Sequence, residues 1–366
     1  MSTKPSRQNN HKFFMELAYL QAKKVLGNTK ENPAVGCIIV KDNQVISAAH
    51  TSIDGRPHAE KNALYLSQKN SINASLYVTL EPCSHYGKTG PCTLLIKKHK
   101  IKKVFYSMND PDYRTFNKSE LFFKTQKIIL KKNILNHFAM NFYKSYINSK
   151  NKALPYVMAK LAVSKDFYTI DLRRKWITNE FSRKRVHLLR GIHDCLLTSA
   201  ATINKDNPSL TTRISGLEYT TPICIIIDKN LNINVNSNIV NNAKKRKTII
   251  FYQNGKQKII NLLNKKKVKL IKFNLESDKK FNLEKLLYKI KSLGYSRIFL
   301  ESGLNLTKNF LKNKLINDFS LFISSNNLGR NGLNKFVVRN YLIKKKNFLT
   351  ENVNLFGDKF VSYNIK

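Results

Sequence analysis

The stretch His58-Ala59-Glu60, read together with Glu81-Pro82-Cys83 and Pro91-Cys92, decides the fold of the first half of this 366-residue chain. One imidazole and two thiolates can hold a tetrahedral Zn²⁺ and leave its fourth position to water, as a catalytic zinc site requires. Glu60 lies too close to His58 to be an ordinary fourth ligand, but it can carry a proton from that water to a leaving amine. The pattern predicts hydrolytic deamination at an amino-substituted ring carbon.

The surrounding sequence separates this interpretation from a chance pattern. A lone His-x-Glu is common, and two cysteines are more often buried apolar side chains than metal ligands. Here, however, a strand-like run Tyr77-Val78-Thr79-Leu80 leads into Glu81-Pro82-Cys83. Pro91 stands where an apolar helix begins, a position that suits proline. Because motif and context agree, the sequence favours a zinc site.

The net charge of +42 is the most extreme feature of the composition, with 65 Lys and Arg against 23 Asp and Glu. Such a balance can indicate nucleic-acid binding. The basic runs, such as Lys244–Lys247 and Lys265–Lys267, are nevertheless scattered and lack interleaved aromatics. They are therefore typical of a solvated surface, and we expect no specific nucleic-acid partner, only a general attraction for anionic substrates.

Other features of the composition indicate a globular cytoplasmic protein. The hydrophobic fraction is 42%, and no apolar run approaches the ~18 residues of a membrane span. The first residues are polar, unlike a secretory signal. Cys37, Cys195 and Cys224 are expected to be reduced core residues in a reducing compartment. We therefore expect no membrane association.

The order of elements predicts two α/β domains, at 1–150 and 151–366, because single cores rarely grow beyond about 250–300 residues. The first half is expected to contain a helix over 11–26, a hairpin turning at Asp42-Asn43, and two further helix-and-strand units at 60–80 and 92–107. A polar segment, Asn148–Lys152, is taken as the boundary. The second half is expected to form a mostly parallel sheet from strands at 156–161, 223–228, 248–252, 268–273 and 297–301, with a helix at 283–293.

The spacing of the cysteines narrows the class of deaminase. Deaminases that act on nucleic acids carry Pro-Cys-x-x-Cys. Here eight residues separate Cys83 from Cys92. A longer loop brings additional groups over the pocket, and Lys88 within it could reach an anionic phosphate.

At this point the sequence resembles a known family, the bifunctional riboflavin-biosynthesis deaminase/reductases. The resemblance covers nearly the whole chain and rests on His58-Ala59-Glu60, Glu81-Pro82-Cys83-Ser84-His85-Tyr86-Gly87-Lys88-Thr89-Gly90-Pro91-Cys92, Trp176-Ile177-Thr178 and the stretch 201–213. It implies a cytidine-deaminase-like α/β domain followed by a dihydrofolate-reductase-like α/β domain. The first would use zinc to deaminate a diaminohydroxyphosphoribosylaminopyrimidine, and the second would use NADPH to reduce the ribosyl group of the product to ribityl.

The resemblance also implies site residues. Glu60 would be catalytic, with His58, Cys83 and Cys92 as the metal ligands. The deaminase substrate would be bound by Asn32, His50, Lys88 and Asp110. The cofactor would lie near Lys160, Ala162, Trp176, Thr202 and Asp206. The reductase substrate would be bound by Arg190, Leu210, Arg213 and Glu301, with Arg174 nearest the place of an expected serine.

The residue types alone leave several of these roles open. Arg190 and Arg213 can bind phosphate through two hydrogen bonds, but arginine in so basic a chain is ordinarily a surface residue. Glu301 follows an apolar strand, where ligand sites of α/β sheets form, yet it could equally neighbour a helix N-cap. Trp176, the only tryptophan, is favoured as a core residue on composition.

Three segments depart from the family pattern. The loop after Asp110-Pro111 lacks the expected glycine turn and is predicted to take another path, so Asp112 is not transferred as a ligand. Phe167 replaces a glycine and is expected to crowd the backbone near the nicotinamide. The segment 169–175 is shorter and lacks a serine that would contact substrate.

Because two of the departures fall in the second half, an active deaminase with an impaired or lost reductase is an alternative. An RNA-base deaminase and a non-catalytic nucleic-acid-binding protein are further alternatives, and a homo-oligomer is left open.

Overall fold

The computed structural model describes residues 7–274, 282–337, 348–350 and 353–365. The chain divides into two compact units, Met1–Ala153 and Leu154–Lys366. The predicted boundary at 150/151 falls at the end of helix α6 (Lys144–Asn151), so the predicted polar linker is helical. No helix within the described ranges is long and apolar enough to cross a membrane.

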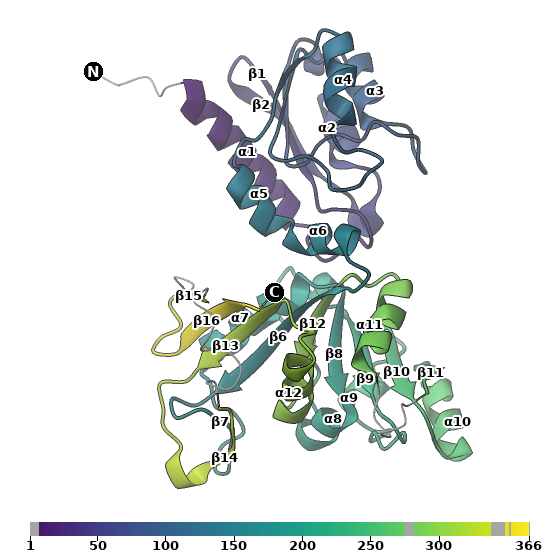
Figure 1. The fold of residues 1–366 in the computed structure, drawn as a ribbon, viewed down its shortest axis with the longest axis vertical. Helices are drawn as coiled ribbons and strands as arrows, with labels where there is room; N and C mark the ends of the chain where they lie inside the picture. Colours follow the sequence, from purple (N-terminus) through teal and green to yellow (C-terminus); the bar gives the residue numbers. More distant parts are fainter. Residues whose placement is uncertain (1–6, 275–281, 338–347, 351–352, 366) are drawn as a thin grey trace. The chain divides into compact units, whose positions relative to one another are not determined.

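The N-terminal unit is a five-stranded sheet covered by helices (Figure 1). The strand order is β2-β1-β3-β4-β5, antiparallel at β2, β1 and β3 and parallel from β3 to β5. Its strands are β1 (Gly36–Lys41), β2 (Gln44–His50), β3 (Ser75–Val78), β4 (Lys103–Tyr106) and β5 (Ile129–Lys131). Besides α6, its helices are α1 (Arg7–Lys23), α2 (Ala59–Ser67), α3 (Cys92–Lys98), α4 (Lys118–Thr125) and α5 (Asn136–Phe142).

The predicted hairpin is confirmed at β1 and β2. Asp42 and Asn43 both adopt positive φ, 48° and 64°, which is the geometry of the two-residue turn that matches strand twist. Strand β3 begins and ends earlier than the predicted 77–80, so Thr79 to Glu81 lie in the loop that leads to the site. The helices of the predicted helix-and-strand units at 60–80 and 92–107 correspond to α2 and α3, each beginning at a residue of the motif.

The C-terminal unit is built on a nine-stranded sheet with the order β11-β10-β9-β8-β12-β6-β13-β16-β15 (Figure 1). It is parallel from β11 to β13 and antiparallel at β16 and β15, which confirms the mostly parallel sheet. Its strands are β6 (Tyr156–Val163), β8 (Cys195–Ser199), β9 (Ile223–Ile227), β10 (Thr248–Tyr252), β11 (Lys269–Lys272), β12 (Arg297–Glu301), β13 (Asp318–Ile323), β15 (Phe348–Thr350) and β16 (Lys359–Asn364).

Helices cover both faces of this sheet. Alternate residues of β6 enter different cores: Val157 and Ala159 pack with α11 and α12, whereas Tyr156 and Met158 pack with α7 and α8. The helices are α7 (Glu180–Gly191), α8 (Ala200–Asp206), α9 (Asn238–Asn241), α10 (Gln257–Lys265), α11 (Leu283–Ser292) and α12 (Leu304–Lys312). A separate two-stranded sheet joins β7 (Tyr168–Asp171) and β14 (Gly332–Lys335).

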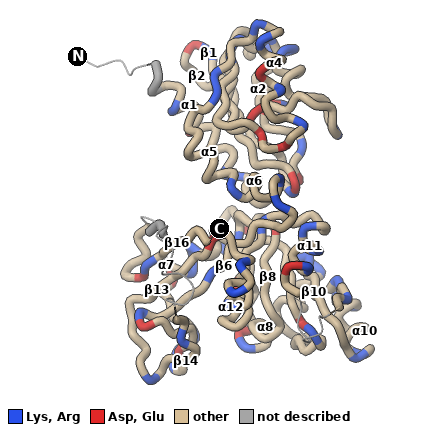
Figure 2. Tube along the Cα trace, in the orientation of Figure 1, with Lys and Arg blue, Asp and Glu red and all other residues tan. Residues whose placement is uncertain are grey.

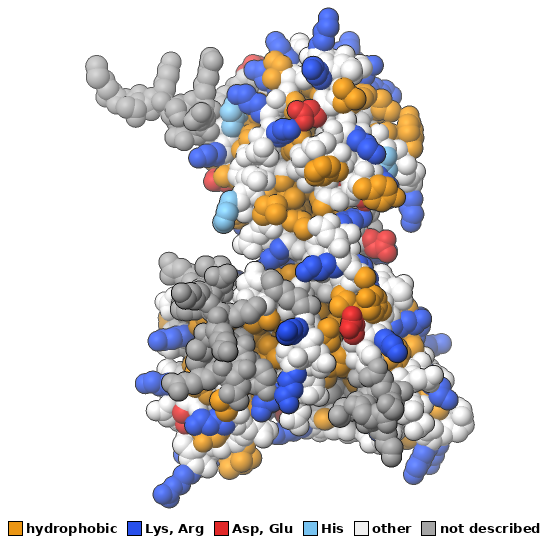
Figure 3. All heavy atoms as spheres, in the orientation of Figure 1, with side chains coloured by type: hydrophobic (Ala, Val, Ile, Leu, Met, Phe, Trp, Pro, Cys, Tyr) orange, Lys and Arg blue, Asp and Glu red, His pale blue; other side chains and the backbone are white. Residues whose placement is uncertain are grey.

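The basic side chains are dispersed. Figure 2 shows Lys and Arg along helices, strands and loops of both units, and on the face drawn in Figure 3 they stand apart, separated by polar and apolar side chains. This distribution agrees with the interpretation of the charge as a solvated surface.

Candidate active sites

The three predicted metal ligands converge in the N-terminal unit. His58 immediately precedes α2, Cys92 is the first residue of α3, and Cys83 lies in the loop after β3. The Nδ1 atom of His58 lies 3.6 Å from the Sγ atom of Cys83 and 3.4 Å from that of Cys92. All three ligand atoms lie within 4.8 Å of one another.

This donor set fits zinc. Tetrahedral bonds of about 2.05 Å to nitrogen and about 2.3 Å to sulfur place those two atoms about 3.6 Å apart, close to both observed distances. The Cys92 amide also donates to Cys83 Sγ at 3.3 Å, which fixes the sulfur's position. Hydrogen bonding from the Cys92 thiol, helped by His58, lowers the pKa of the Cys83 thiol to about 4, and the same bond and burial raise the pKa of the Cys92 thiol. Of the two sulfurs Cys83 is thus the thiolate, and a metal would displace the proton of Cys92.

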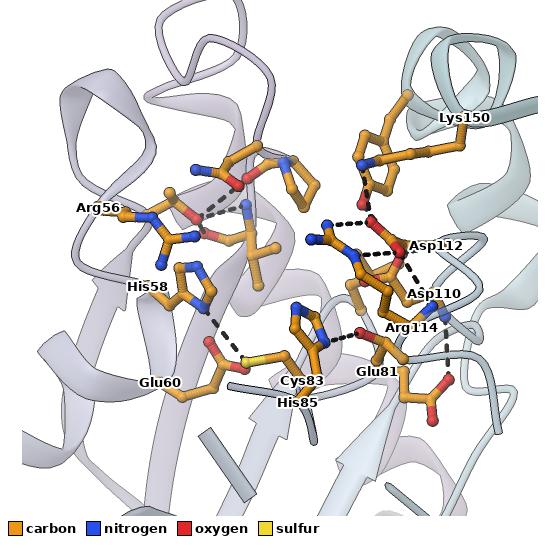
Figure 4. Close-up of a pocket in the computed structure, with 17 residues that line it drawn as sticks. Arg56, His58, Glu60, Glu81, Cys83, His85, Asp110, Asp112, Arg114 and Lys150 are labelled. Atoms are coloured by element: carbon orange, nitrogen blue, oxygen red, sulfur yellow. Dashed lines mark hydrogen bonds and ion pairs between the residues drawn. The ribbon is translucent and has the colours of Figure 1, made fainter. Parts of the chain in front are cut away.

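Glu60 lies beside this cluster. It stands in the first turn of α2, is only 4% exposed, and its carboxylate lies close to His58 and Cys83 (Figure 4). Burial raises the pKa of Glu60 to about 7, against the lowering effect of His58. A carboxyl group that both accepts and donates a proton near neutral pH suits general acid–base catalysis.

A pocket opens from this cluster, and charged side chains line it (Figure 4). Of the predicted substrate residues, Asn32 and Asp110 lie on its wall. Asp110 accepts hydrogen bonds from the Tyr146 hydroxyl at 3.0 Å and the Asp112 amide at 2.9 Å, and burial raises its pKa to about 6. His50 and Lys88 are not among the lining residues, and Lys88 is exposed on the loop between the cysteines.

The sequence did not indicate several residues of the pocket wall. Asp112 accepts hydrogen bonds from Arg114 through Nε at 2.9 Å and Nη2 at 2.6 Å, and from Lys150 at 2.8 Å. On the other side, Arg56 donates to the Thr89 hydroxyl at 2.8 Å. No motif marks Arg114 or Lys150, because they reach the pocket through tertiary contacts.

The glycine-free loop after Asp110 does form a defined turn. Asn117 adopts the left-handed conformation with φ 58°, and Glu81 accepts from the amides of Asp110, Asn117 and Ser119, each at 3.1 Å. Glu81 is only 3% exposed. The buried carboxylate therefore organises the loop that carries Asp112 and Arg114 into the pocket.

In the C-terminal unit a buried ion cluster forms at the carboxyl ends of β12 and β6. Arg190 on α7 donates to Glu301 through Nε at 2.8 Å and Nη2 at 2.9 Å, and Lys160 Nζ lies 3.8 Å from Glu301. Burial alone would raise the pKa of Glu301, but Arg190 and Lys160 hold it at about 2. Burial lowers the pKa of Lys160. Arg190 is thus a buried partner of Glu301 and not a surface residue. Glu301 ends β12 two residues before Gly303, the N-cap of α12, and its carboxylate pairs with the two cations.

Leu210 and Arg213 lie on the loop that faces this cluster. Arg190 Nη1 donates to the Thr211 carbonyl at 2.8 Å, and the Arg213 amide donates to His187 Nδ1 at 2.9 Å. Arg213 is exposed, whereas Leu210 is buried with φ 52°. His187 was missed, although its place three residues before Arg190 on one helix was a signal available from the sequence.

The residues expected near the cofactor lie on neighbouring strands and helices. Thr202 Oγ1 accepts from the Gly303 amide at 3.1 Å, which joins the first turn of α8 to the start of α12. Ala162 lies on β6, and Asp206 is exposed at the end of α8. Ala162 and Thr202 lie near the carboxyl ends of β6 and β8, the edge at which α/β sheets form ligand sites.

Trp176 and Arg174 are both exposed. Trp176 is 54% exposed, so the prediction of a core residue is wrong; its ring instead has the Arg183 guanidinium 5.1 Å and the Lys175 ammonium 5.3 Å from its centroid.

Phe167 occupies a glycine-like conformation with φ 68°. Its side chain packs against the core that contains Val163 and Phe336, and its carbonyl accepts from the Phe336 amide at 2.8 Å. Phe167 therefore adopts a left-handed conformation that glycine takes more readily, with its ring packed against the core.

Comparison with known proteins identifies both halves. Residues 8–108 match the cytidine and deoxycytidylate deaminase zinc-binding region, and residues 155–359 match the RibD C-terminal domain. The riboflavin biosynthesis protein RibD of Aquifex aeolicus is 31% identical over 320 residues, covering 87% of this chain and 88% of the relative. That of Bacillus amyloliquefaciens is 31% identical and covers 82% and 80%.

Comparison with solved structures leads to the same family. The Thermotoga maritima diaminohydroxyphosphoribosylaminopyrimidine deaminase/5-amino-6-(5-phosphoribosylamino)uracil reductase superposes with a TM-score of 0.82 at 27% identity, covering 98% of this chain and 99% of that one. A structure of Acinetobacter baumannii RibD gives 0.81 at 26% identity with the same coverage.

Proposed function

This chain belongs to the RibD family of riboflavin biosynthesis, and from that premise we propose that it catalyses two successive reactions. The N-terminal unit removes the amine of a diaminohydroxyphosphoribosylaminopyrimidine by hydrolysis. The C-terminal unit then reduces the ribosyl group of the product, 5-amino-6-(5-phosphoribosylamino)uracil, to ribityl with NADPH. We assign the deaminase to 1–150 and the reductase to 151–366.

The observation that carries the deaminase assignment is the convergence of His58, Cys83 and Cys92 beside the buried carboxyl group of Glu60. When bound there, Zn²⁺ lowers the pKa of water and so supplies a nucleophile at neutral pH. Glu60 accepts a proton from the nucleophile and returns it to the leaving amine. Asn32 and Asp110 on the pocket wall bind and orient the pyrimidine, and we assign His50 and Lys88 to the same substrate.

The reductase assignment rests on the cluster around Glu301. NADPH supplies a hydride when it is bound near Lys160, Ala162, Trp176, Thr202 and Asp206. Arg190 and Lys160 hold Glu301 as an anion that can accept hydrogen bonds from ribose hydroxyls. Arg213, on the loop that Arg190 fixes through Thr211, remains exposed for the phosphate. We assign Leu210 and Arg174 to the same substrate.

We place the enzyme in the cytoplasm, and the five free cysteines among the described residues support that placement. The dispersed basic side chains support a small-molecule partner without a specific nucleic acid.

The test combines purified full-length protein, the aminopyrimidine and NADPH. We expect bound zinc, the mass of the ribitylamino product, and one NADPH oxidised for each substrate consumed. Deaminated product that accumulates without NADPH oxidation would refute the reductase assignment. Deamination of a transfer RNA, with no change in the aminopyrimidine, would refute the whole proposal.

A further inference from the structure

The cations that line the deaminase pocket are arginines and a lysine that no motif marks. Arg56 and Arg114 lie on its wall together with Lys150, whereas Lys88 does not. Lys88 lies on the exposed part of the loop between the cysteines. A phosphate carried by a substrate inside this pocket therefore meets Arg56 and Arg114 before Lys88.

Arg114 is held in a defined position. The Asp112 carboxylate, whose side chain is 6% exposed, binds Nε and Nη2 of Arg114, and it also binds Lys150. Among the described residues, no partner of Arg114 Nη1 is found, and the side chain is 49% exposed. Figure 4 shows the guanidinium between Asp112 and the interior of the pocket. Asp112 thus fixes one edge of the guanidinium and leaves another toward the pocket.

Arg56 faces it from the opposite wall (Figure 4). Its Nη1 atom donates to Thr89, which ties the guanidinium to the loop between the cysteines. Its Nη2 atom lies 3.8 Å from the position that a Cβ atom on Gly87 would occupy, so it runs close along the same loop. Two guanidinium groups that are each anchored on one side lose little rotational freedom when they bind an anion.

We propose that Arg56 and Arg114 form the phosphate-binding subsite of the deaminase pocket, and that Asp112 is a positioning residue that orients Arg114. This inference rests on the proposed deaminase function and adds to it the residues that select a phosphorylated substrate. The charges support it: Asp112 is shared between Arg114 and Lys150, so these three groups together keep one positive charge, and among the described residues Arg56 forms no ion pair and donates only to the Thr89 hydroxyl.

The test measures kcat/KM of deamination for the phosphorylated aminopyrimidine and for the same compound after phosphatase treatment. We expect the wild type to prefer the phosphorylated compound. We expect Arg114→Gln and Arg56→Gln each to reduce that preference about ten- to hundredfold, because a hydrogen bond to a charged group typically contributes about 1.5–3 kcal/mol. Lys88→Gln is expected to reduce it less, and Lys124→Gln, an exposed charge on α4 outside the pocket, is the matched control.

Zinc content and the midpoint of thermal unfolding verify that the variants are folded. Because each arginine is replaced separately, one misfolded variant leaves the other to decide. A wild type with no preference, or arginine variants that keep the wild-type preference, would overturn the subsite while leaving the deaminase intact. A wild type that deaminates neither compound would overturn the proposed function and the subsite with it.

Discussion

Replacing Glu301 by glutamine should lower the unfolding free energy of the C-terminal unit, because the variant loses the ion pairs of Glu301 with Arg190 and Lys160. Arg190 and Lys160 hold the pKa of Glu301 at about 2, against the ordinary glutamate value of 4.5. That difference corresponds to about 3 kcal/mol of stability at neutral pH, since one pKa unit is about 1.4 kcal/mol. The side chain is 14% exposed, so solvent screening removes little of this contribution.

The contribution of Glu301 to stability should depend on pH, because the pKa of its carboxyl group is lowered in the folded state. A carboxyl group with a lowered pKa in the folded state stabilises the fold above the unfolded value of 4.5, and the contribution is lost as pH falls toward 2. Glutamine resembles the protonated form at every pH. The difference in unfolding free energy between wild type and Glu301→Gln should thus stay near about 3 kcal/mol from pH 8 to 5 and narrow by about 1.4 kcal/mol per pH unit below 4.5.

Urea unfolding followed by tryptophan fluorescence is a suitable assay. Trp176 is the only tryptophan and lies in the C-terminal unit, so its emission reports on that unit. Glu180→Gln removes an exposed carboxylate that pairs with Lys184, and should change stability by less than about 0.5 kcal/mol. The reasoning would be refuted if Glu301→Gln and Glu180→Gln lowered the unfolding free energy equally. It would also be refuted if the difference in unfolding free energy between wild type and Glu301→Gln did not vary below pH 4.5.

Three further predictions concern other parts of the chain. Glu60→Gln should abolish deamination while zinc remains bound, because a proton carrier is lost but no ligand; metal analysis beside product mass checks this, and residual turnover near the wild-type rate would contradict it. Cys83→Ser should lose zinc and destabilise the N-terminal unit, and a variant that retains one zinc per chain would disprove the ligand assignment. Lys267→Gly should stabilise the C-terminal unit by about 1 kcal/mol, because exposed Lys267 has φ 65° just after α10; Lys265→Gly, at the last residue of that helix and without a positive φ, should bring no gain, and urea unfolding compares the two.

Local sequence signals were sufficient wherever a few neighbouring residues determine the structure. Asp42-Asn43 specify the turn between β1 and β2, and Pro91 and His58 mark the starts of α3 and α2. Two of the three metal ligands were predictable for the same reason, since His58 and Cys92 lie at helix starts that the sequence indicates, whereas Cys83 lies within a loop and was identified by its motif. The parallel sheet followed from apolar runs such as Ile223–Ile227 that are buried on both faces.

Structure that depends on tertiary contacts was not predictable in this way. The polar segment 148–152 suggested a linker, yet α6 extends through Asn151. Tyr146 on this helix packs against the core and donates to Asp110, and Lys150 pairs with Asp112, 38 residues away in sequence. No local pattern encodes that approach. The exposure of Trp176 was missed because composition says nothing of the cations that flank its ring.

The contacts around Phe167 and Glu301 bear on whether the C-terminal unit retains its reductase activity. The departures from the family pattern lie in the loop at Phe167 and in the segment near Arg174, whereas the cluster of Arg190, Lys160 and Glu301 belongs to helix and strand positions. Phe167 keeps a positive φ and places its ring in the core, so it does not force the backbone away from the path that a glycine would take. Since Arg190 and Lys160 remain paired with Glu301, the group assigned to the ribose hydroxyls, the structure favours a chain that retains reduction.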